Sequence, residues 1–401
     1  MVDNRSQSEY RYRISIQYLD TAKNIATDIK NESLKSLIID HNFDNNCMPI
    51  VYANLKLDRA LLDDMILNMD KNLIILTVSK YDNLTDLKLN VTCFRNKFIY
   101  FTPDNVNKMK DADYNEETEA TMKGDTYSEV TLGLLCLDHV NNNKVKCELT
   151  AKDITMYNIV KLITSHIPSM IIEPFNYNET FAQFNLKPQD SVNKALRYLN
   201  NYRVFYSSPY RYYEDFNFTY IISSSGKATQ RKDERYSSVV LQIRDPTEDD
   251  ANSTGVFTNR STGTYEVYVN YANTQVYDNT IQNKSRNKML GITSSGASLK
   301  TLRNNASYSN TKIHNVRLTN DNIHMLDNLE YQDNMENFLL YFSKNDLDND
   351  LFTINKRITI HNINRYQEYN GEYLLYRKRE VYLREDETFV MSSMINMKRL
   401  R

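Results

Sequence analysis

KPQDSVNKALRYLNNYRVFYSSPYRYYEDFNFTYIISSSGK, residues 187–227, is the stretch that decides the fold of this chain. Pro188 suits the first position of a helix, where a backbone N–H is not needed. Apolar residues then recur at helical spacing: Val192, Ala195, Leu196 and Leu199. Val204–Tyr206 predicts a short strand, Ser207–Pro209 a turn, and residues 216–222 a half-buried strand. The segment therefore predicts one helix that runs into a Tyr-rich hairpin.

This order of elements resembles the hub proteins at the tip of long-tailed bacteriophage tails. The residues that match the family's helix, S-x-x-x-A-L-x-x-L, and its strands, Y-x-V-F-Y and T-Y-I-I-S, are Ser191, Ala195, Leu196, Leu199, Val204, Phe205, Tyr206, Thr219, Tyr220 and Ile221. A second match lies near the C-terminus. YNGEY, residues 369–373, opens a strand-like run that closes on MINMKRLR, residues 394–401, and hub proteins often end on such a basic strand.

The resemblance implies a mainly β protein with two tube-like antiparallel β-barrel domains and a small α/β module. It implies a homotrimeric ring in the tail baseplate of the virion, assembled in the host bacterial cytoplasm. Such a ring joins the sixfold tail tube protein to the threefold central spike protein, beside baseplate wedge proteins. Its channel passes the tape measure protein and, only in transit, DNA. Two similar but unequal barrels per subunit would let threefold and sixfold partners meet.

Composition independently limits the possible functions. The 401 residues are enough for two or three domains. Lys and Arg number 49 and Asp and Glu 51, so no strong positive field favours general DNA binding. The four cysteines, Cys47, Cys93, Cys136 and Cys147, show no metal spacing and predict reduced thiols in a cytosol-made protein. No apolar leader and no membrane span are expected from the hydrophobic pattern.

Residues 1–150 predict the first β-barrel domain. Tyr10, Tyr12, Ile14, Ile16 and Tyr18 alternate with polar residues, which is the period of a strand with one buried face. Further strands are predicted at Ser36–His41, Pro49–Lys56, Asn72–Lys80, Leu87–Phe94, Lys97–Thr102, Glu129–Asp138 and Lys144–Thr150. One short helix, with Asp58 as its N-cap, interrupts them. The acidic stretch Asp111–Asp125 predicts a solvated loop.

Residues 151–230 predict the α/β insertion module. Asp153 suits the N-cap of a helix that Pro168 ends, and residues 170–172 predict a strand. The apolar stripe of that helix is Met156, Ile159, Val160, Ile163 and Ile167.

Residues 231–401 predict a second β-barrel domain. Its strands are expected at Tyr236–Arg244, Thr264–Tyr271, Thr311–Thr319, Phe338–Ser343, Leu351–Ile363, Glu372–Leu383 and Phe389–Lys398. From Tyr277 to Ser309, Ser, Asn, Thr and Gly dominate with little periodicity, which predicts a long excursion or flexible arm. No sequence repeat relates the two strand-rich sections, so a duplicated barrel follows from the resemblance alone.

No motif in the sequence predicts a catalytic, cofactor-binding or metal-binding residue. Asp346–Asp350 begins like a calcium loop, but Leu351 replaces the required Gly and Arg357 the required Glu. No phosphate-binding glycine motif occurs, and Gly291–Gly296 has the wrong spacing for a nucleophile elbow. The histidines form no zinc motif: they are His41, His139, His166, His314, His324 and His361.

Two clusters have more than one interpretation. Arg377–Arg379, near several carboxylates, predicts a solvated, ion-paired face; the alternative is a charged channel wall or a contact with an acidic neighbour. The second basic cluster is Lys398, Arg399 and Arg401. The tyrosines from Tyr206 to Tyr220 predict core and subunit-interface packing, with a stacking platform for bases or sugars as the alternative.

Two other functions stay open on the sequence. A tail-associated peptidoglycan hydrolase needs a cleft with convergent carboxylates, which can be far apart in sequence, or a metal. A host-glycan-binding β module would use exposed tyrosines. The favoured prediction is a structural protein rather than an enzyme.

Overall fold

The computed structural model describes residues 10–43, 46–82, 91–102, 127–203, 205–206 and 210–223. Farther along the chain it describes residues 238–244, 255–259, 264–270, 274–277, 286–293, 296–303, 313–316, 337–342, 352–354, 357–361, 367 and 370–399, those between 238 and 342 by their backbone alone. The secondary structure is mainly β with few helices, as the sequence predicts.

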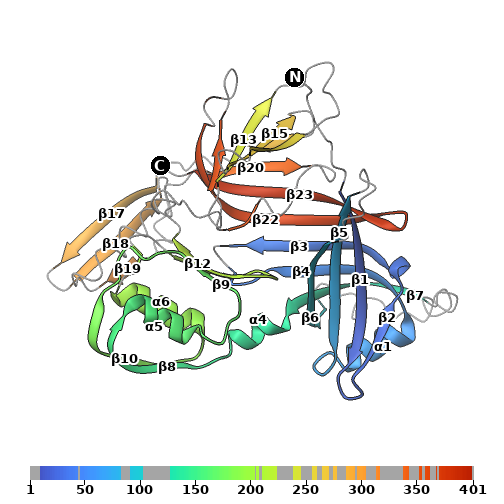
Figure 1. Cartoon of the computed structure of the whole chain (residues 1–401), viewed down its shortest axis with the longest axis horizontal. Coiled ribbons are helices and arrows are strands. Elements are labelled where there is room, and N and C mark those ends of the chain that lie inside the picture. The colour runs from blue at the N-terminus through green and yellow to red at the C-terminus, as the bar shows by residue number, and fades with distance from the viewer. Residues whose placement is uncertain are drawn as a thin grey trace.

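Eight antiparallel strands close into a barrel (Figure 1). Around it the strands follow one another as β1, β5, β6, β7, β4, β3, β22 and β23, and β23 pairs with β1 through Phe389 and Tyr12. Their bounds are β1 (Tyr10–Asp20), β3 (Leu34–Asn42), β4 (Ile50–Asp58), β5 (Leu73–Asp82), β6 (Val91–Phe101), β7 (Tyr127–Cys136), β22 (Gly371–Glu385) and β23 (Thr388–Arg399). A short strand, β2 (Ile25–Ile29), adds to β1, and the 3₁₀ turn η1 (Asn31–Ser33) leads into β3.

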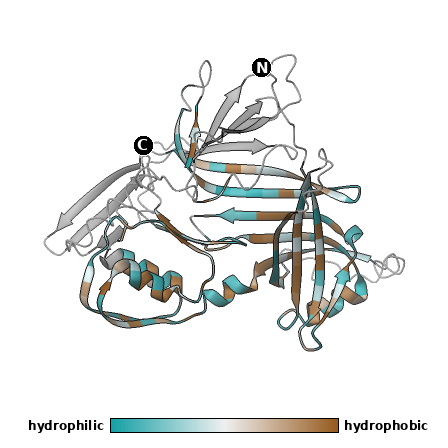
Figure 2. Ribbon diagram, viewed as in Figure 1, coloured by the Kyte–Doolittle hydropathy of each residue, from teal (hydrophilic) through white to brown (hydrophobic). Residues whose placement is uncertain are grey.

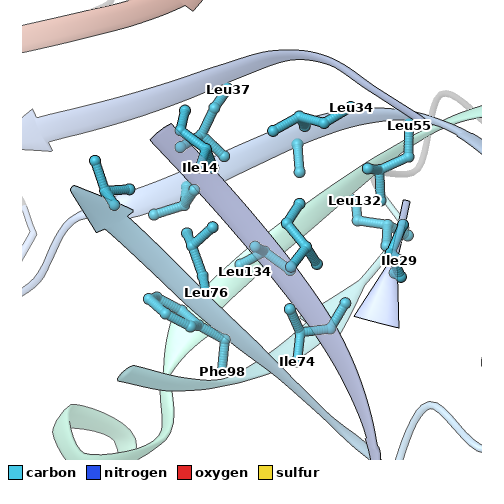
Figure 3. Packing of buried hydrophobic residues seen from close by; sticks show 14 of the residues in the cluster. Ile14, Ile29, Leu34, Leu37, Leu55, Ile74, Leu76, Phe98, Leu132 and Leu134 are labelled. Carbon is cyan, nitrogen blue, oxygen red and sulfur yellow. The ribbon is translucent and has the colours of Figure 1, made fainter. Parts of the chain in front are cut away.

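Alternating apolar side chains fill the barrel. The predicted face of β1 points inward, and Tyr12, Ile14, Ile16 and Tyr18 are each 5% exposed or less. Leu37, Leu76, Phe98 and Leu134 are among the residues that meet them from the other strands (Figure 3). Polar and apolar residues interleave along the wall (Figure 2), because successive side chains of a strand point to opposite faces.

The predicted short helix is α1 (Arg59–Leu67), beside the barrel. Asp58 caps it as expected: its side chain accepts a hydrogen bond of 2.9 Å from the backbone N–H of Ala60. Met65 is buried and contributes to the barrel core.

The C-terminal hairpin β22–β23 is shared between two sets of strands. Its tip half closes the barrel, since residues 377–383 pair with β3 and Phe389 pairs with Tyr12. Its other half pairs with β21 (Arg357–Ile360) and β20 (Asn337–Phe342). A β-bulge between Leu375 and Arg377 separates the halves on β22. Two barrel strands thus come from the C-terminal section of the chain, whereas the sequence pattern places the first barrel before residue 150.

The extra strands extend the sheet on both sides of the hairpin. One arm is β20 and β16 (Thr274–Tyr277); the other is β21, β13 (Ser238–Arg244), β15 (Thr264–Asn270) and β14 (Gly255–Asn259). Strand β13 runs parallel to β15 and β21. Within the described strands, the two arms do not pair with each other.

The predicted arm at residues 277–309 contains regular strands. Strands β17 (Arg286–Thr293), β18 (Gly296–Arg303) and β19 (Ile313–Val316) form an antiparallel sheet apart from the barrel sheet. The excursion is therefore structured in part, although its sequence lacks clear alternation. The acidic stretch 111–125 and the calcium-like loop 346–350 lie outside the described residues.

The α/β module has a core of its own. A ribbon of β8 (Cys147–Thr155) and β10 (Thr180–Gln189) packs with α5 (Met156–Ile163) and α6 (Val192–Arg203). A second small sheet contains β9 (Met170–Ile172), β12 (Thr219–Ser223) and β11 (Tyr210–Glu214). The module leaves the barrel through α4 (Leu137–Asn142), which follows β7 directly (Figure 1).

Several local predictions for this module are wrong in detail. Pro188 lies in β10, and α6 begins at Val192. Asp153 lies in β8 with φ 48°, and Thr155 caps α5 instead. Residues 144–150 were predicted for the first barrel, but β8 belongs to the module. Residues 205–206 form a bend rather than a strand, and β12 is buried throughout rather than half-buried. The apolar stripes of both helices are buried as predicted.

No helix in the described part of the chain is long and apolar enough to cross a membrane.

Candidate functional site

Strand β11 lies where the module, the barrel and the shared hairpin meet, and it contacts all three. Arg211 donates from Nη1 to the backbone oxygen of Leu375 at the hairpin bulge, at 2.6 Å. Tyr212 packs in the module core. Tyr213 places its hydroxyl 3.0 Å from His41 Nδ1 at the end of β3. Glu214 contacts α4, so four successive residues tie together three parts of the molecule.

Glu214 is fully buried and accepts three hydrogen bonds. Asn142 Nδ2 donates at 2.9 Å, Asn143 Nδ2 at 2.7 Å, and the Tyr212 hydroxyl at 2.6 Å. Burial raises the pKa of Glu214 to about 7, although these three hydrogen bonds act in the opposite direction. The backbone is fixed as well, since the N–H of Glu214 donates to the carbonyl of Cys47 at 2.7 Å.

A charged layer fills the end of the barrel beneath β11. Lys378 and Glu380 are each 5% exposed, and Lys378 Nζ lies 2.8 Å from Glu380 Oε1. Glu380 also accepts from the hydroxyl of Tyr382 at 2.8 Å. His41 Nε2 is 3.8 Å from Glu380, but burial and the nearby Lys378 lower the pKa of His41 to about 3. The His41 ring is therefore neutral at pH 7, and Lys378 and Glu380 form the ion pair.

The β11–β12 turn covers the same end of the barrel with aromatic rings. Phe216 stacks on Phe94 of β6 with ring centroids 4.1 Å apart, and on His139 of α4 at 6.4 Å. Phe43 contacts Tyr213 with centroids 4.7 Å apart. His41, which lies beside Glu380, contacts the rings of Phe43, Tyr213 and Phe216, so the module packs against this end of the barrel.

The first predicted basic cluster divides between two faces of β22. Arg377 lies outside and pairs with Asp40 through Nε at 2.9 Å and Nη2 at 2.5 Å. Lys378 points inward, because neighbouring residues of a strand face opposite sides. The prediction of a solvated, ion-paired face is thus confirmed for Arg377 and wrong for Lys378. No local signal in the sequence marks which side faces the barrel interior.

The other predicted groups are scattered. Arg399 donates to the Asn370 carbonyl at 2.6 Å, while the Lys398 side chain and Arg401 lie outside the described residues. Tyr206, Tyr213 and Tyr220 are each 3% exposed or less, so the prediction of core packing is confirmed for them and a stacking platform at these rings is ruled out. The cysteines are free thiols.

The described residues contain no group of three or more His, Cys, Asp or Glu side chains placed to hold a metal ion. His41 and His139 are buried at the module junction, whereas His166 and His361 are exposed. The geometry builds a joint between parts of the chain, and sequence reasoning missed Arg211 and Glu214, whose partners are distant in sequence.

Comparison with known proteins gives a family and a set of distant folds. The family model described as "Bacteriophage PBS1 gene 109 protein" matches residues 4–400. A search of curated proteins gives no match. Among solved structures, a tail protein from Neisseria meningitidis MC58 is 9% identical, with 96% of each chain covered and a TM-score of 0.46.

Two further solved structures are similar at the same level. The E. coli c3393 protein, a component of the type VI secretion system, is 6% identical, with 92% of this chain and 73% of that chain covered and a TM-score of 0.41. The prophage tail protein gp18 from Listeria monocytogenes EGD-e is 10% identical, with 96% and 94% covered and a TM-score of 0.39. Similarity this distant does not transfer a role, whereas the family model spans nearly the whole chain. The chain therefore belongs to the family of the bacteriophage PBS1 gene 109 protein.

Proposed function

We propose that this bacteriophage protein is a structural subunit of the tail, and specifically a baseplate hub. Three copies would form a ring that joins a sixfold tail tube to a threefold central spike. The ring would line the channel for the tape measure protein and then DNA, and baseplate wedge proteins would contact its outside. Its place would be the virion baseplate, after assembly in the host cytoplasm.

The shared hairpin is the observation that carries this proposal. A tube wall shared among subunits must be stiff, and β22–β23 runs from a closed barrel into a second group of strands, with one β-bulge between Leu375 and Arg377. The ladder of main-chain hydrogen bonds along 15 and 12 residues couples the two groups more rigidly than a linker would. We propose that the second group completes a tube-like unit in residues 231–401, with residues 151–230 as the insertion between the two walls.

The chemistry of the described residues agrees with a role in assembly. At the junction, Arg211, Glu214 and Lys378 are buried polar residues that bind other side chains or the backbone. Such contacts fix the relative positions of the module, barrel and hairpin. The proposed function depends on the shape that these contacts maintain.

The test is the mass and form of the purified full chain. Light scattering is expected to give about 142 kDa, which is three times the 47.2 kDa of one chain, and negative-stain images are expected to show threefold rings. A strictly monomeric chain at high concentration would contradict the proposal. Clearing of cell wall in a zymogram would instead support a peptidoglycan hydrolase, and specific signals on a glycan array would support a host-binding module.

A further inference from the structure

The barrel and the α/β module are two separately packed bodies. The barrel core and the module core share no residue, and each is a continuous apolar cluster. Between them lies the junction defined by residues 211–218 of the module and by His41, His139 and the hairpin of the barrel. Contacts of this mixed polar and aromatic kind are typical of interfaces between parts that move relative to each other.

Two histidines of the barrel side face the module turn. His41 is 2% exposed and meets the Tyr213 hydroxyl at 3.0 Å and the ring of Phe216 at 6.3 Å. His139 is 6% exposed and stacks on the ring of Phe216 with centroids 6.4 Å apart. Its Nδ1 is buried without a hydrogen-bond partner in the described structure. A protonated imidazole needs a partner for each N–H, so the His139 site does not suit the charged ring unless water enters.

The surrounding charges act on His41 in both directions. Lys378 lies beside His41 on β22 and lowers the pKa of His41, while Asp215 and Asp40 raise it. Burial is the largest effect at both rings, and it lowers the pKa of His139 to about 4. The other charged and titratable groups at the junction are Asp138 on α4, Glu380 on β22, Arg211 and Tyr212 on β11, Cys47 after β3, and Cys147 on β8.

We propose that the module is released from the barrel end in acid, through protonation of His41 and His139, and that Glu214 opposes this release. Release would let water reach both imidazoles and the Lys378–Glu380 layer, which is already polar and tolerates hydration. Glu214 acts the other way because its docked site favours the protonated carboxyl. This inference concerns one chain and does not depend on the proposed ring.

The sign of each contribution follows from the pKa in the docked and released states. Between pH 6.5 and 4.5 each histidine binds a proton in the released state but not in the docked state. Each histidine therefore raises the equilibrium constant for release about tenfold for every unit by which the pH falls. Over the same range docked Glu214 holds a proton that the released carboxylate lacks, which lowers the constant about tenfold per unit. The net expectation is about tenfold per pH unit for the native chain.

A single tryptophan can report the release, because the chain has none. In the full chain, Phe216→Trp places it at the junction, and a red shift of its emission maximum measures access of water. Phe184→Trp, in the buried module core, is the matched reporter for unfolding of the module itself. Release is expected to shift the emission maximum of the Phe216→Trp chain at a pH where that of the Phe184→Trp chain is unchanged.

Three variants of the reporter chain separate the contributions. Glu214→Gln should steepen release to about a hundredfold per pH unit and move its midpoint to lower pH, because the neutral amide resembles the protonated carboxyl that the docked site favours. His41→Gln should make release nearly independent of pH, and His41→Gln with His139→Gln should reverse the slope. Equal midpoints in all variants would overturn the inference. So would a Phe184→Trp shift that coincides with that of Phe216→Trp, because the transition would then be global acid unfolding.

Discussion

The closure of the barrel can be tested through one pair of rings. Tyr12 of β1 and Tyr382 of β22 meet edge to face, with centroids 5.1 Å apart and planes at 82°. They are 370 residues apart in sequence, and they touch only if the C-terminal hairpin completes the wall. Both side chains are at least 97% buried. A measured coupling energy between the two side chains would therefore report that the C-terminal hairpin closes the barrel.

The expected magnitude follows from the geometry of this pair. Tyr12→Leu and Tyr382→Leu each keep much of the buried volume and should each lower the free energy of unfolding by about 1–3 kcal/mol. An edge-to-face aromatic pair contributes about 0.5–1.5 kcal/mol beyond its buried area. The double variant should therefore be more stable than the sum of the two single losses predicts, by that amount.

Urea unfolding followed by far-UV circular dichroism supplies the four free energies of the cycle. The control pairs Tyr12→Leu with Tyr206→Leu, because Tyr206 lies in the module core and not in the barrel core. These two changes should add within about 0.5 kcal/mol. A coupling of zero for Tyr12 and Tyr382, with the singles still destabilising, would refute closure by the hairpin.

Other predictions concern single contacts. Gly133→Ala should destabilise the chain by about 1–3 kcal/mol, because its Cβ would lie 2.3 Å from the ring of Phe101, and Phe101→Leu added to it should restore part of the loss in the same unfolding assay. Tyr206→Phe should cost about 1–2 kcal/mol, since its hydroxyl donates to two buried backbone carbonyls at 2.7 and 3.1 Å; an unchanged urea midpoint would contradict this. Asp40→Asn should cost less than about 1 kcal/mol, because its partner Arg377 is partly exposed to solvent, and the difference should shrink in high salt.

Local pattern predicted the elements whose form depends on near neighbours. Alternation identified the inward face of β1, and the Asp58 cap identified α1. Local pattern gave the wrong element where strand pairing or a second candidate cap residue determined the structure. Pro188 suits the start of a helix, yet the pairing of β10 with β8 extends the strand through it. Asp153 suits an N-cap, yet Thr155 caps α5, because its side chain accepts a hydrogen bond from the helix backbone.

The junction was beyond prediction because its contacts are long-range. The tyrosine-rich segment was correctly expected to pack inside the protein, but nothing within it shows that Arg211 reaches the hairpin bulge or that Glu214 reaches α4. The same applies to Lys378, whose inward direction depends on register with β3. Such contacts follow from strand order, which the spacing of apolar residues does not encode.

The proposed function makes shape the working property of the protein. A stiff hairpin, a closed barrel and a module packed against the barrel end would together hold the subunit in one form while its ring carries other proteins. The proposed acid release would let the module move away from the barrel end, while the barrel and the hairpin keep their arrangement. The two ideas are tested separately, since release is measured by the emission of a tryptophan at the junction and ring formation by the mass and shape of the purified protein.

Cryo-electron microscopy of intact virions, with an affinity tag on this chain marked by a bound antibody fragment, is the most direct test of the hub proposal. The account predicts three copies at the tip of the tail, arranged around its axis between tube and spike, with the barrel walls surrounding the channel. Density for the antibody on the capsid, along the tail shaft, or nowhere on the particle would contradict it.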